Sequence, residues 1–440
     1  MPPPTKTLLS VGESNGRPTT LVLGAGMAGL AAARTLTDAG YAVTILEARD
    51  RIGGRIWTNR TLDGLALDLG ASWIHGTDHP ALPTLARRYN ATTVMTDYDR
   101  HTVYDSNGRL LDDDELEEME EAFAELLEEL QEWGEEQEDD LSLQRALDQF
   151  LQGESLTAEE RRQLNYAINT TLEHEFAADA AQLSLWYFDE GEEIEGDDVI
   201  FPNGYDQLTS GLATGLDVRL GQVVQRVAYG ADGVEVTTAQ GTFTADYALV
   251  TLPLGVLQSG DIDFAPPLPP AKQEAIGRLG MGLLNKLYLR FPEVFWEEES
   301  HLLGYMAAEK GQWGEWLNLY ALLGEPVLLG FNAGSYGRQL ETLSDEQIIA
   351  SAMQVLRTIY GADIPNPTSH LITRWATDPF ARGSYSYLAP HATPADRTTL
   401  AEPIDEVLFF AGEATWADAP ATVHGAYLSG LHAAELIQNT

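Results

Sequence analysis

The stretch TTLVLGAGMAGLAAARTLTDAGYAVTILEARDRIGGR, residues 19–55, decides the fold class of this chain. It has the pattern of a β-strand, a glycine turn, a helix and a second strand. The turn Gly24-Ala25-Gly26-Met27-Ala28-Gly29 is GxGxxG: the first glycine permits the tight turn, the second lets a pyrophosphate approach, and the third lets helix pack on strand. The amides at the helix start suit phosphate groups. The stretch therefore predicts an α/β, Rossmann-like dinucleotide-binding domain.

The residues after the second strand indicate which dinucleotide is bound. Glu47 ends that strand about 20 residues beyond the glycines, where an acid binds a ribose 2′-hydroxyl. Ala48 and Arg49 follow, and a second glycine turn at Gly53-Gly54 leads to Arg55. A second phosphate-facing element suits FAD, which lies extended across such a domain. We therefore expect FAD as the cofactor.

The length of 440 residues exceeds one ordinary core and predicts two intertwined domains. Pieces of the nucleotide domain occur at the start, middle and end of the chain, so we expect it to be assembled discontinuously around an inserted α+β substrate domain. The expected FAD-binding parts are 18–80, 204–265 and 401–440; the substrate domain comprises a mainly helical part, 81–203, and a sheet-and-helix part, 266–400.

Finer patterns predict individual elements. Residues 80–149 look mostly helical, and apolar residues at helical spacing within 111–140 predict an amphipathic helix with an acidic outer face. Turn signals at 231–233 and 240–241 separate short strands. Further strands are expected at 282–291, 301–307, 314–321 and 326–332, with a helix near 344–360.

Composition excludes several classes of function. The chain has no cysteine, which excludes disulfides, thiolate catalysis and flavin attachment through a thiol, and we expect no metal site. The net charge of −42 argues against nucleic acid. The acidic surface is either salt adaptation or a field that concentrates cationic substrates. Residues 1–18 have the pattern of a loose tail, and no apolar run is long enough to span a membrane, so we expect a soluble, cytoplasmic protein with no membrane partner and no assigned protein partner.

Five ordered blocks resemble the flavin amine oxidase family, and in particular its polyamine (spermine and spermidine) oxidase branch. They are DLGASWIHG at 68–76, TLPLGVL at 251–257, RW with DP and RGSYSY within 374–387, AGEAT at 411–415 and ATVHGA at 421–426. The ExxxRxGGR pattern beginning at Glu47 also matches this family. The resemblance covers nearly the whole chain after residue 18.

The resemblance implies three catalytic residues. Lys286, in the strand pattern GLLNKLYLRF at 282–291, falls where the family places a lysine beside flavin N5, often bridged by water. The alternative is a lysine on an edge strand, which protects against aggregation. Tyr385 would face the flavin and position the amine. Thr422 stands where monoamine oxidases have a second tyrosine, and Ser384 where they have the cysteine that bonds FAD, so FAD should be held noncovalently.

Substrate-binding and cofactor-binding positions follow from the same resemblance. Trp73, His75 and Glu175 would bind substrate, with Glu175 meeting a distal ammonium. The acidic run between Asp189 and Asp198 is either a guide for polycations or a solvated loop. The residues expected at the cofactor are Gly24, Gly26, Ala28, Gly29, Glu47, Ala48, Arg49, Gly54, Arg55, Gly70, Ala71, Ser72, Trp73, Val223, Trp375, Tyr385, Gly412, Glu413, Thr422 and Val423.

These positions imply an FAD-dependent oxidase of polyamines. Hydride would pass from the carbon next to nitrogen to flavin N5, the imine would hydrolyse to an aldehyde and a shorter amine, and O2 would reoxidise the flavin to give H2O2. Its partners would be a small cationic amine and O2. The alternatives are a monoamine or L-amino acid oxidase of the same family and, from another class, a flavin-binding interaction module whose acidic helix docks a basic partner. Histone-lysine demethylation is disfavoured by the lack of an accessory domain or coiled-coil insertion.

Overall fold

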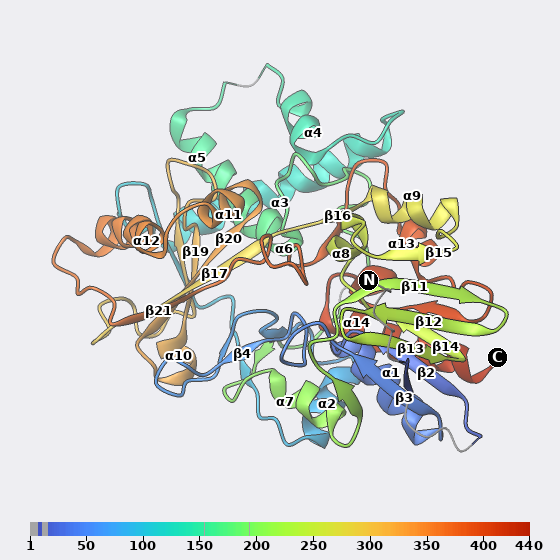
Figure 1. The fold of residues 1–440 in the computed structure, drawn as a ribbon. Coiled ribbons are helices and arrows are strands. Elements are labelled where there is room, and N and C mark those ends of the chain that lie inside the picture. The colour runs from blue at the N-terminus through green and yellow to red at the C-terminus, as the bar shows by residue number, and fades with distance from the viewer. Residues whose placement is uncertain (1–7, 11–15, 154, 193) are drawn as a thin grey trace, which may run out of the picture.

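Residues 8–10, 16–153, 155–192 and 194–440 are described by a computed structural model of the chain. They form two lobes, each built on a β-sheet, with a group of helices lying over them (Figure 1). The lobe that holds the first strands also holds the C-terminal end.

A five-stranded parallel sheet is the centre of the first lobe, in the order β10-β3-β2-β14-β23. Its strands are β10 (Asp217–Arg219), β3 (Ala42–Leu46), β2 (Thr19–Leu23), β14 (Tyr247–Val250) and β23 (Leu408–Phe410). The strands come from the start, middle and end of the chain. The predicted α/β class with a discontinuous Rossmann-like domain is confirmed, whereas the individual domain boundaries remain a prediction.

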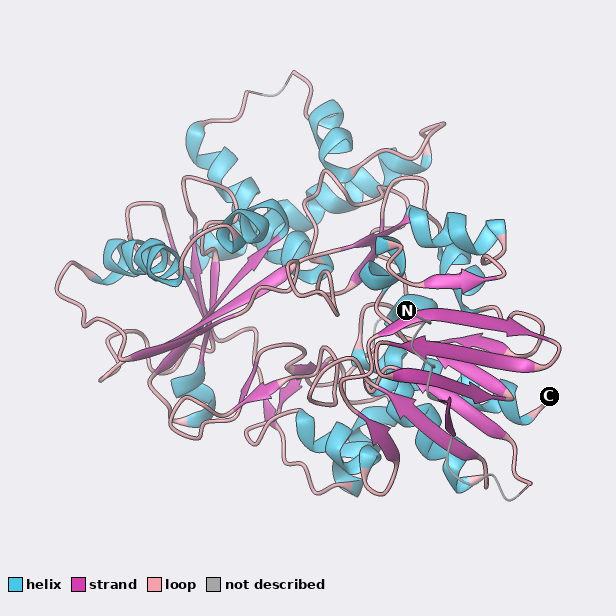
Figure 2. Ribbon diagram, viewed as in Figure 1, coloured by secondary structure: helices cyan, strands magenta, loops and turns pink. Residues whose placement is uncertain are grey.

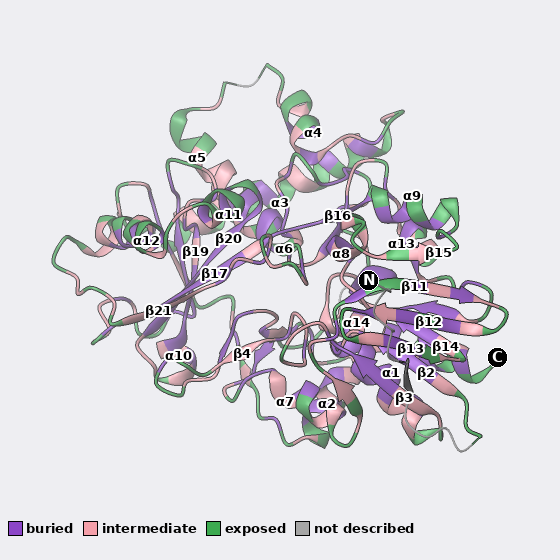
Figure 3. Ribbon diagram, in the orientation of Figure 1, coloured by how far each residue is buried: buried purple, intermediate pink, exposed green. Residues whose placement is uncertain are grey.

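Apolar side chains pack on both faces of this sheet. Most residues of β2, β3, β14 and β23 are buried (Figure 3). On one face lie α1 (Met27–Asp38), α14 (Val423–Gln438), α2 (Ala81–Arg88) and α7 (Asp206–Ala213), sharing a core that includes Val22, Leu30 and Ile437. A second core, including Leu21, Leu23 and Phe243, joins the other face to a five-stranded sheet. That sheet runs β1 (Leu8–Ser10), β13 (Gly241–Ala245), β12 (Gly233–Thr238), β11 (Val224–Gly230) and β15 (Asp263–Ala265).

The second sheet tests the predicted turns and the predicted loose tail. Its hairpins turn at 231–232 and 239–240, which confirms the predicted turn signals. The prediction of a loose tail at 1–18 is wrong for residues 8–10, because β1 pairs in parallel with β13. Residues 1–7 and 11–15 lie outside the described part of the chain.

The second lobe contains a six-stranded sheet in the order β21-β17-β20-β19-β18-β8. Its strands are β21 (Ser369–Ile372), β17 (Leu284–Arg290), β20 (Val327–Ala333), β19 (Glu315–Asn318), β18 (Leu302–Tyr305) and β8 (His101–Tyr104). Helices α11 (Gly334–Glu341) and α12 (Asp345–Tyr360) cover one face. The expected strands and the helix near 344–360 are confirmed.

Lys286 does not lie on an edge strand. β17 pairs with β20 on one side and with β21 on the other, and Lys286 is opposite Phe331 of β20. The edge-strand interpretation of this lysine is therefore wrong, because distant segments at 327–333 and 369–372 enclose the strand. Lys286 is only 5% exposed.

The helices above the lobes are α3 (Asp113–Glu135), α4 (Leu143–Phe150), α5 (Ala158–Ala167), the π-helix η1 (Ile168–Glu173) and α6 (His174–Phe176) (Figure 2). The amphipathic helix is confirmed: Asp112 and Glu115 form a capping box at its start, and Phe123 and Leu130 are buried. The expectation that 80–149 is mostly helical is only partly right, because β7 (Val94–Met95) and β8 interrupt it.

The remaining described helices and strands are short. They are β4 (Thr58–Asn59), β5 (Leu67–Asp68), β6 (Trp73–Ile74), β9 (Val199–Ile200), α8 (Leu254–Ser259), α9 (Pro270–Arg278), β16 (Leu279–Met281), α10 (Leu319–Leu323), β22 (Ser386–Leu388), α13 (Pro394–Ala401) and η2 (Glu413–Thr415). Among the described residues, no helix combines the length and apolar character needed to cross a membrane.

The third glycine of the turn carries a stability prediction. A Cβ on Gly29 would lie 2.1 Å from the Gly24 carbonyl oxygen and 2.9 Å from Thr251 Oγ1. Gly29→Ala should therefore push α1 away from β2 and destabilise the FAD-free protein by about 1–3 kcal/mol, measured by urea unfolding. Gly26→Ala is the matched control, because its Cβ would meet nothing within 4 Å and its φ of −79° suits alanine. Equal stability of the two variants would contradict this packing role.

Candidate active site

A cavity of about 1060 Å³ runs from the start of α1 to the six-stranded sheet. Every predicted site residue except Gly29 lines it; Gly29 packs α1 behind the wall instead. The predicted residues along the wall are Gly24, Gly26, Ala28, Glu47, Ala48, Arg49, Gly54, Arg55, Gly70, Ala71, Ser72, Trp73, His75, Glu175, Val223, Lys286, Trp375, Tyr385, Gly412, Glu413, Thr422 and Val423.

The end of the cavity at α1 has the form of a dinucleotide cradle. The N-cap residue Gly26 offers no side-chain cap to α1, so the first-turn amides are open to a ligand. A Cβ on Gly26 or Gly412 would meet no protein atom within 4 Å, which leaves room for a group laid against the backbone. The buried Glu47 carboxylate accepts 2.8 Å hydrogen bonds from the amides of Ala25 and Arg49 and faces the cavity. This donor and acceptor set fits FAD.

The N-terminus of a second helix lines the same cavity. α14 begins at Val423, and the N-cap Thr422 accepts a 2.9 Å hydrogen bond from the amide of Gly425 and donates one of 2.8 Å to the Ala419 carbonyl. The Thr422 hydroxyl is therefore used in capping the helix. The positive end of the α14 dipole is directed at whatever occupies the cavity beside Val423.

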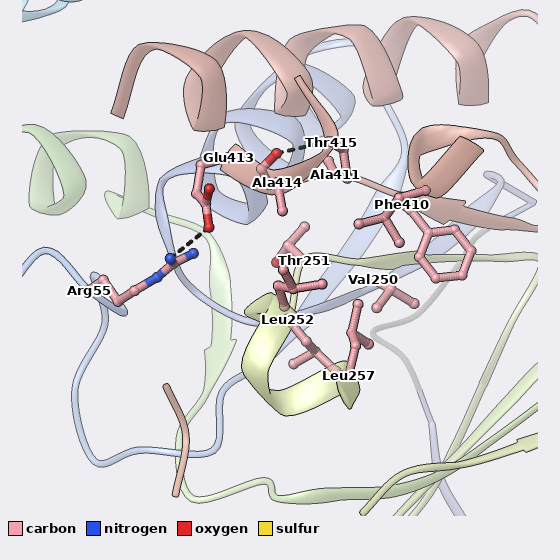
Figure 4. A pocket seen from close by; sticks show the side chains of 13 residues that line it. Arg55, Val250, Thr251, Leu252, Leu257, Phe410, Ala411, Glu413, Ala414 and Thr415 are labelled. Carbon is pink, nitrogen blue, oxygen red and sulfur yellow. Dashed lines mark hydrogen bonds and ion pairs between the residues drawn. The ribbon is translucent and has the colours of Figure 1, made fainter. Parts of the chain in front are cut away.

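A chain of buried charges supports the cavity wall. Arg55 Nη1 lies 2.7 Å from Glu413 (Figure 4), and Ser386 Oγ donates to the other Glu413 oxygen at 2.5 Å. Arg397 donates to Ser386 Oγ and to Glu190. Burial raises the pKa of Glu413, but the charges of Arg55 and Arg397 outweigh it and the pKa is lowered. Glu190 Oε2 is buried at the cavity without a hydrogen-bond partner among the described residues, an acceptor available to a ligand.

Lys286 lies where the two lobes meet. Its Nζ donates to the carbonyls of Asp68 (3.1 Å) and Gly70 (2.6 Å) and to Ser72 Oγ (2.5 Å), and it lies 5.7 Å from the Trp73 ring. Desolvation lowers the pKa of Lys286, and the negative charge of the nearby Asp68 carboxylate only partly offsets this shift. Desolvation likewise raises the pKa of Asp68. A lysine in this environment can change protonation state near neutral pH.

Tyr385 and Trp375 are held rigidly on the same wall. The Tyr385 hydroxyl donates to the His174 carbonyl at 2.5 Å, and burial, then the charge of Glu175, raises its pKa well above the usual value. Trp375 Nε1 donates to the Leu69 carbonyl at 3.0 Å. Ser384 lines the cavity, but its hydroxyl is engaged with the backbone of Leu284. The aromatic planes are therefore fixed before a ligand arrives.

Carboxylates gather at the end of the cavity beyond these aromatic residues. His75 Nδ1 lies 2.7 Å from Asp198, whose other oxygen accepts from the Gly76 amide at 2.8 Å, and the Tyr98 hydroxyl donates to Asp198 at 2.9 Å. Desolvation lowers the pKa of His75, but the hydrogen bond to Asp198 and the negative charge of Asp198 raise it by a larger amount. The pKa of His75 therefore lies above its usual value. Glu175 faces the cavity with no hydrogen-bond or ion-pair partner in the described part of the chain.

Several residues of the site were not predicted from the sequence. Asp198 was named only as one of an acidic run, and nothing in the sequence distinguished it from its neighbours; Glu193 of that run lies outside the described residues. Glu190 was also named only as one of that run, and its ion pair with the buried Arg397 was not predicted. Tyr98, Phe331 and Glu315 were not predicted as site residues. The period-2 alternation of β20 and β19 would have indicated which face Phe331 and Glu315 share, but not which sheet neighbours they have.

Most of the chain matches the model of a known family. The profile of the flavin-containing amine oxidoreductases matches residues 27–438, and the chain belongs to this family. It is therefore a flavin-dependent amine oxidoreductase with FAD as its cofactor, as the sequence predicted.

The chain is also similar to individual proteins of known name or structure. Polyamine oxidase 4 of Oryza sativa subsp. japonica is 37% identical over 434 residues, which cover 95% of this chain and 88% of that protein. Lysine-specific histone demethylase 1 homolog 1 of the same plant is 38% identical over 437 residues, covering 94% of this chain but only 51% of that protein. Among solved structures, putrescine oxidase bound to putrescine has a TM-score of 0.79 at 21% identity, covering 99% of this chain and 100% of that one, which supports the fold.

The cradle yields a prediction for cofactor binding. Gly26→Ala places a methyl group where the backbone meets the cavity, and it should weaken FAD binding about tenfold or more while leaving the FAD-free fold intact. The measurement is a fluorescence titration of apoprotein with FAD. Gly277→Ala, in α9 and also with nothing within 4 Å of its Cβ but away from the cavity, is the control and should bind FAD normally. Unchanged affinity of Gly26→Ala would contradict the placement of the pyrophosphate.

Proposed function

We propose that this protein oxidises polyamines of the spermine and spermidine type at a carbon next to nitrogen. FAD, when bound, supplies the redox chemistry: it takes the hydride of the C–H bond and passes two electrons to O2, giving H2O2. The nitrogen lone pair of the amine forms the C=N bond, and water hydrolyses this imine to an aldehyde and a shorter amine. The observation that carries the proposal is the carboxylate end of the cavity.

Charge in the cavity supports a cationic substrate. Each Lys and Arg in its described lining is already engaged: Arg49 with Asp378, Arg55 with Glu413, Arg397 with Glu190, and Lys286 with backbone and hydroxyl oxygens. A substrate carboxylate would find no free cation there, which disfavours an L-amino acid oxidase. Glu175, in contrast, is a free carboxylate that can pair with an ammonium group.

Several residues have roles that fit this chemistry. Tyr385, fixed by the His174 carbonyl, can orient the reacting carbon, an arrangement that lowers the entropic cost of reaction. The neutral form of Lys286, which its lowered pKa makes accessible, has a lone pair that can accept a proton from the water that attacks the imine. Trp73 stacks on His75 with ring centroids 6.1 Å apart and can cover the alkyl chain. With no cysteine in the chain and Ser384 engaged with Leu284, FAD should be held noncovalently.

A second candidate is demethylation of lysine side chains. Its support is the 38% identity to a plant histone demethylase homolog, although the chain spans about half of that protein. A methylated lysine is also a cationic alkyl amine, so the same cavity charge suits both substrates. The two functions differ in the product: demethylation releases formaldehyde.

Anaerobic mixing with candidate amines tests the proposal. The purified yellow protein is mixed with spermine, spermidine, a benzylic monoamine and a methyl-lysine histone peptide, and the flavin absorbance is followed. We expect rapid bleaching by the polyamines and slow or no bleaching by the others. Bleaching only by the peptide, with formaldehyde released, would favour demethylation, and bleaching only by the monoamine a monoamine oxidase. If no amine bleached the flavin, a flavin-binding interaction module would be favoured.

The pH dependence gives a further prediction. The reacting nitrogen must lose its proton, and the lowered pKa of Lys286 means that its neutral fraction also grows as the pH rises. Spermine oxidation should therefore increase between about pH 6 and 9, measured as kcat/KM. A flat profile over this range would contradict the proposal.

Substitution of Lys286 separates its own contribution to the pH dependence from that of the substrate nitrogen. Lys286→Met should lower turnover about 100-fold while keeping the pH rise that the substrate causes. Lys272→Met is the matched control: among the described residues Lys272 is the other buried lysine, and it donates to the carbonyls of Thr399, Leu400 and Glu402 away from the cavity. It should lose stability but retain turnover per bound FAD. Equal turnover of Lys286→Met and wild type would remove the role of Lys286.

A further inference from the structure

Glu315 is a carboxylate of the cavity with no assigned role. It is the first residue of β19, its side chain is 24% exposed, and it lines the cavity. The ring of His174 lies close by, with Nδ1 3.6 Å from Glu315 Oε1, beyond hydrogen-bond distance. Lys310, the nearby lysine, is already paired at 2.7 Å with Glu173 of η1. Within the described residues, Glu315 is thus not neutralised by a Lys or Arg side chain.

The side chain of His174 has unpaired ring nitrogens at the same place. It is 8% exposed and lines the cavity, yet neither Nδ1 nor Nε2 has a hydrogen-bond partner in the described part of the chain. A buried polar atom without a partner is costly, so such atoms are normally satisfied by protein, water or ligand. A ring nitrogen that accepts a hydrogen bond, next to a carboxylate, is complementary to a group with several N–H donors.

The position of this pair relative to Lys286 sets the length of the ligand. Lys286 Nζ lies 6.0 Å from the centre of the Phe331 ring, and that ring lies 6.1 Å from the ring of His174. Within the sheet, Phe331 of β20 separates Lys286 from Glu315: it is opposite Lys286 of β17, and on its other side the pairing of Gly330 with Trp316 brings Glu315 of β19 next to it. A ligand that reaches Glu315 from beside Lys286 must pass an aromatic ring, which an alkyl chain can do favourably and a compact monoamine cannot.

Glu175 and Glu315 hold different positions along this path. Glu175 directly follows His174, whose carbonyl accepts the hydrogen bond of Tyr385, so Glu175 adjoins the reaction centre. Glu315 belongs to β19 and is separated from Lys286 by Phe331 of β20. Glu175 is therefore the inner carboxylate and Glu315 the outer one. Burial, then Asp198, and then the charges of Glu315 and Glu175 raise the pKa of Tyr98, which agrees with both carboxylates lining one cavity.

We propose that Glu315 and His174 form a far subsite that binds the terminal primary ammonium of a polyamine, while Glu175 meets an inner nitrogen. The inference rests on the proposed polyamine oxidation and names its substrate class: polyamines of three or more nitrogens with an unmodified end. An acetylated end is a neutral amide and would leave the Glu315 charge unpaired.

Binding to the reduced holoenzyme tests the subsite without turnover. The flavin is reduced with dithionite under anaerobic conditions, and calorimetry gives the Kd of spermine and of N1,N12-diacetylspermine, in which both ends are neutral. Glu315→Gln should weaken spermine binding about 10- to 100-fold and leave diacetylspermine binding nearly unchanged. Glu315→Asp, which keeps the charge, should restore part of the affinity. Glu299→Gln, at an exposed glutamate outside the cavity, removes the same charge and should change neither Kd.

The possible outcomes distinguish failure of the proposed polyamine oxidation from failure of the far subsite. If wild-type protein does not bind spermine, the proposed function fails. If wild type binds spermine and Glu315→Gln binds it equally well, only the far subsite is overturned. Equal weakening for spermine and diacetylspermine would also overturn it, because the effect would then not depend on the chain end.

Discussion

The burial of the Lys286 ammonium is the constraint on which the site depends. A charged nitrogen inside a central strand must be compensated, and the oxygens of Asp68, Gly70 and Ser72 do this. Asp68 is the last residue of β5 and Gly70 and Ser72 follow that strand, whereas Lys286 belongs to the six-stranded sheet. The same segment packs against the cofactor cradle, since a Cβ on Gly70 would lie 1.6 Å from the Arg55 carbonyl oxygen. The lysine therefore fixes the substrate sheet against the cradle, and the cavity lies along that junction.

Charge distribution supports the proposal that the cavity binds a cationic ligand. The chain has 26 Lys and Arg against 68 Asp and Glu, so each buried cation can be matched and carboxylates remain. In the cavity, arginines are paired within the protein, and Glu175 and Glu315 are left to face a ligand. Negative charge on low-dielectric walls favours cations. These two carboxylates line the cavity itself and are separate from the general acidity of the surface.

The sequence predicted those parts of the site that depend on local pattern. Gly24–Gly29 with the strand before it and the helix after it determined the cradle, and the ordered blocks placed Lys286 and Tyr385 on the cavity. Strand neighbours are set by pairing between distant segments, so the interior position of β17 was not predictable from its own residues. Asp198 could not be told from the other acids of its loop, because only the fold brings it to His75. The capping role of the Thr422 hydroxyl likewise depends on backbone geometry.

The central claim is that one cavity joins the flavin cradle to a carboxylate end that holds a polyamine. A crystal structure of the dithionite-reduced holoenzyme with spermine tests it most directly. The account predicts spermine extended through the cavity, with a carbon beside Tyr385 and Lys286 and nitrogens at Glu175 and Glu315. Spermine bound only on the outer acidic face, such as that of α3, with none of its atoms in the cavity, would contradict it.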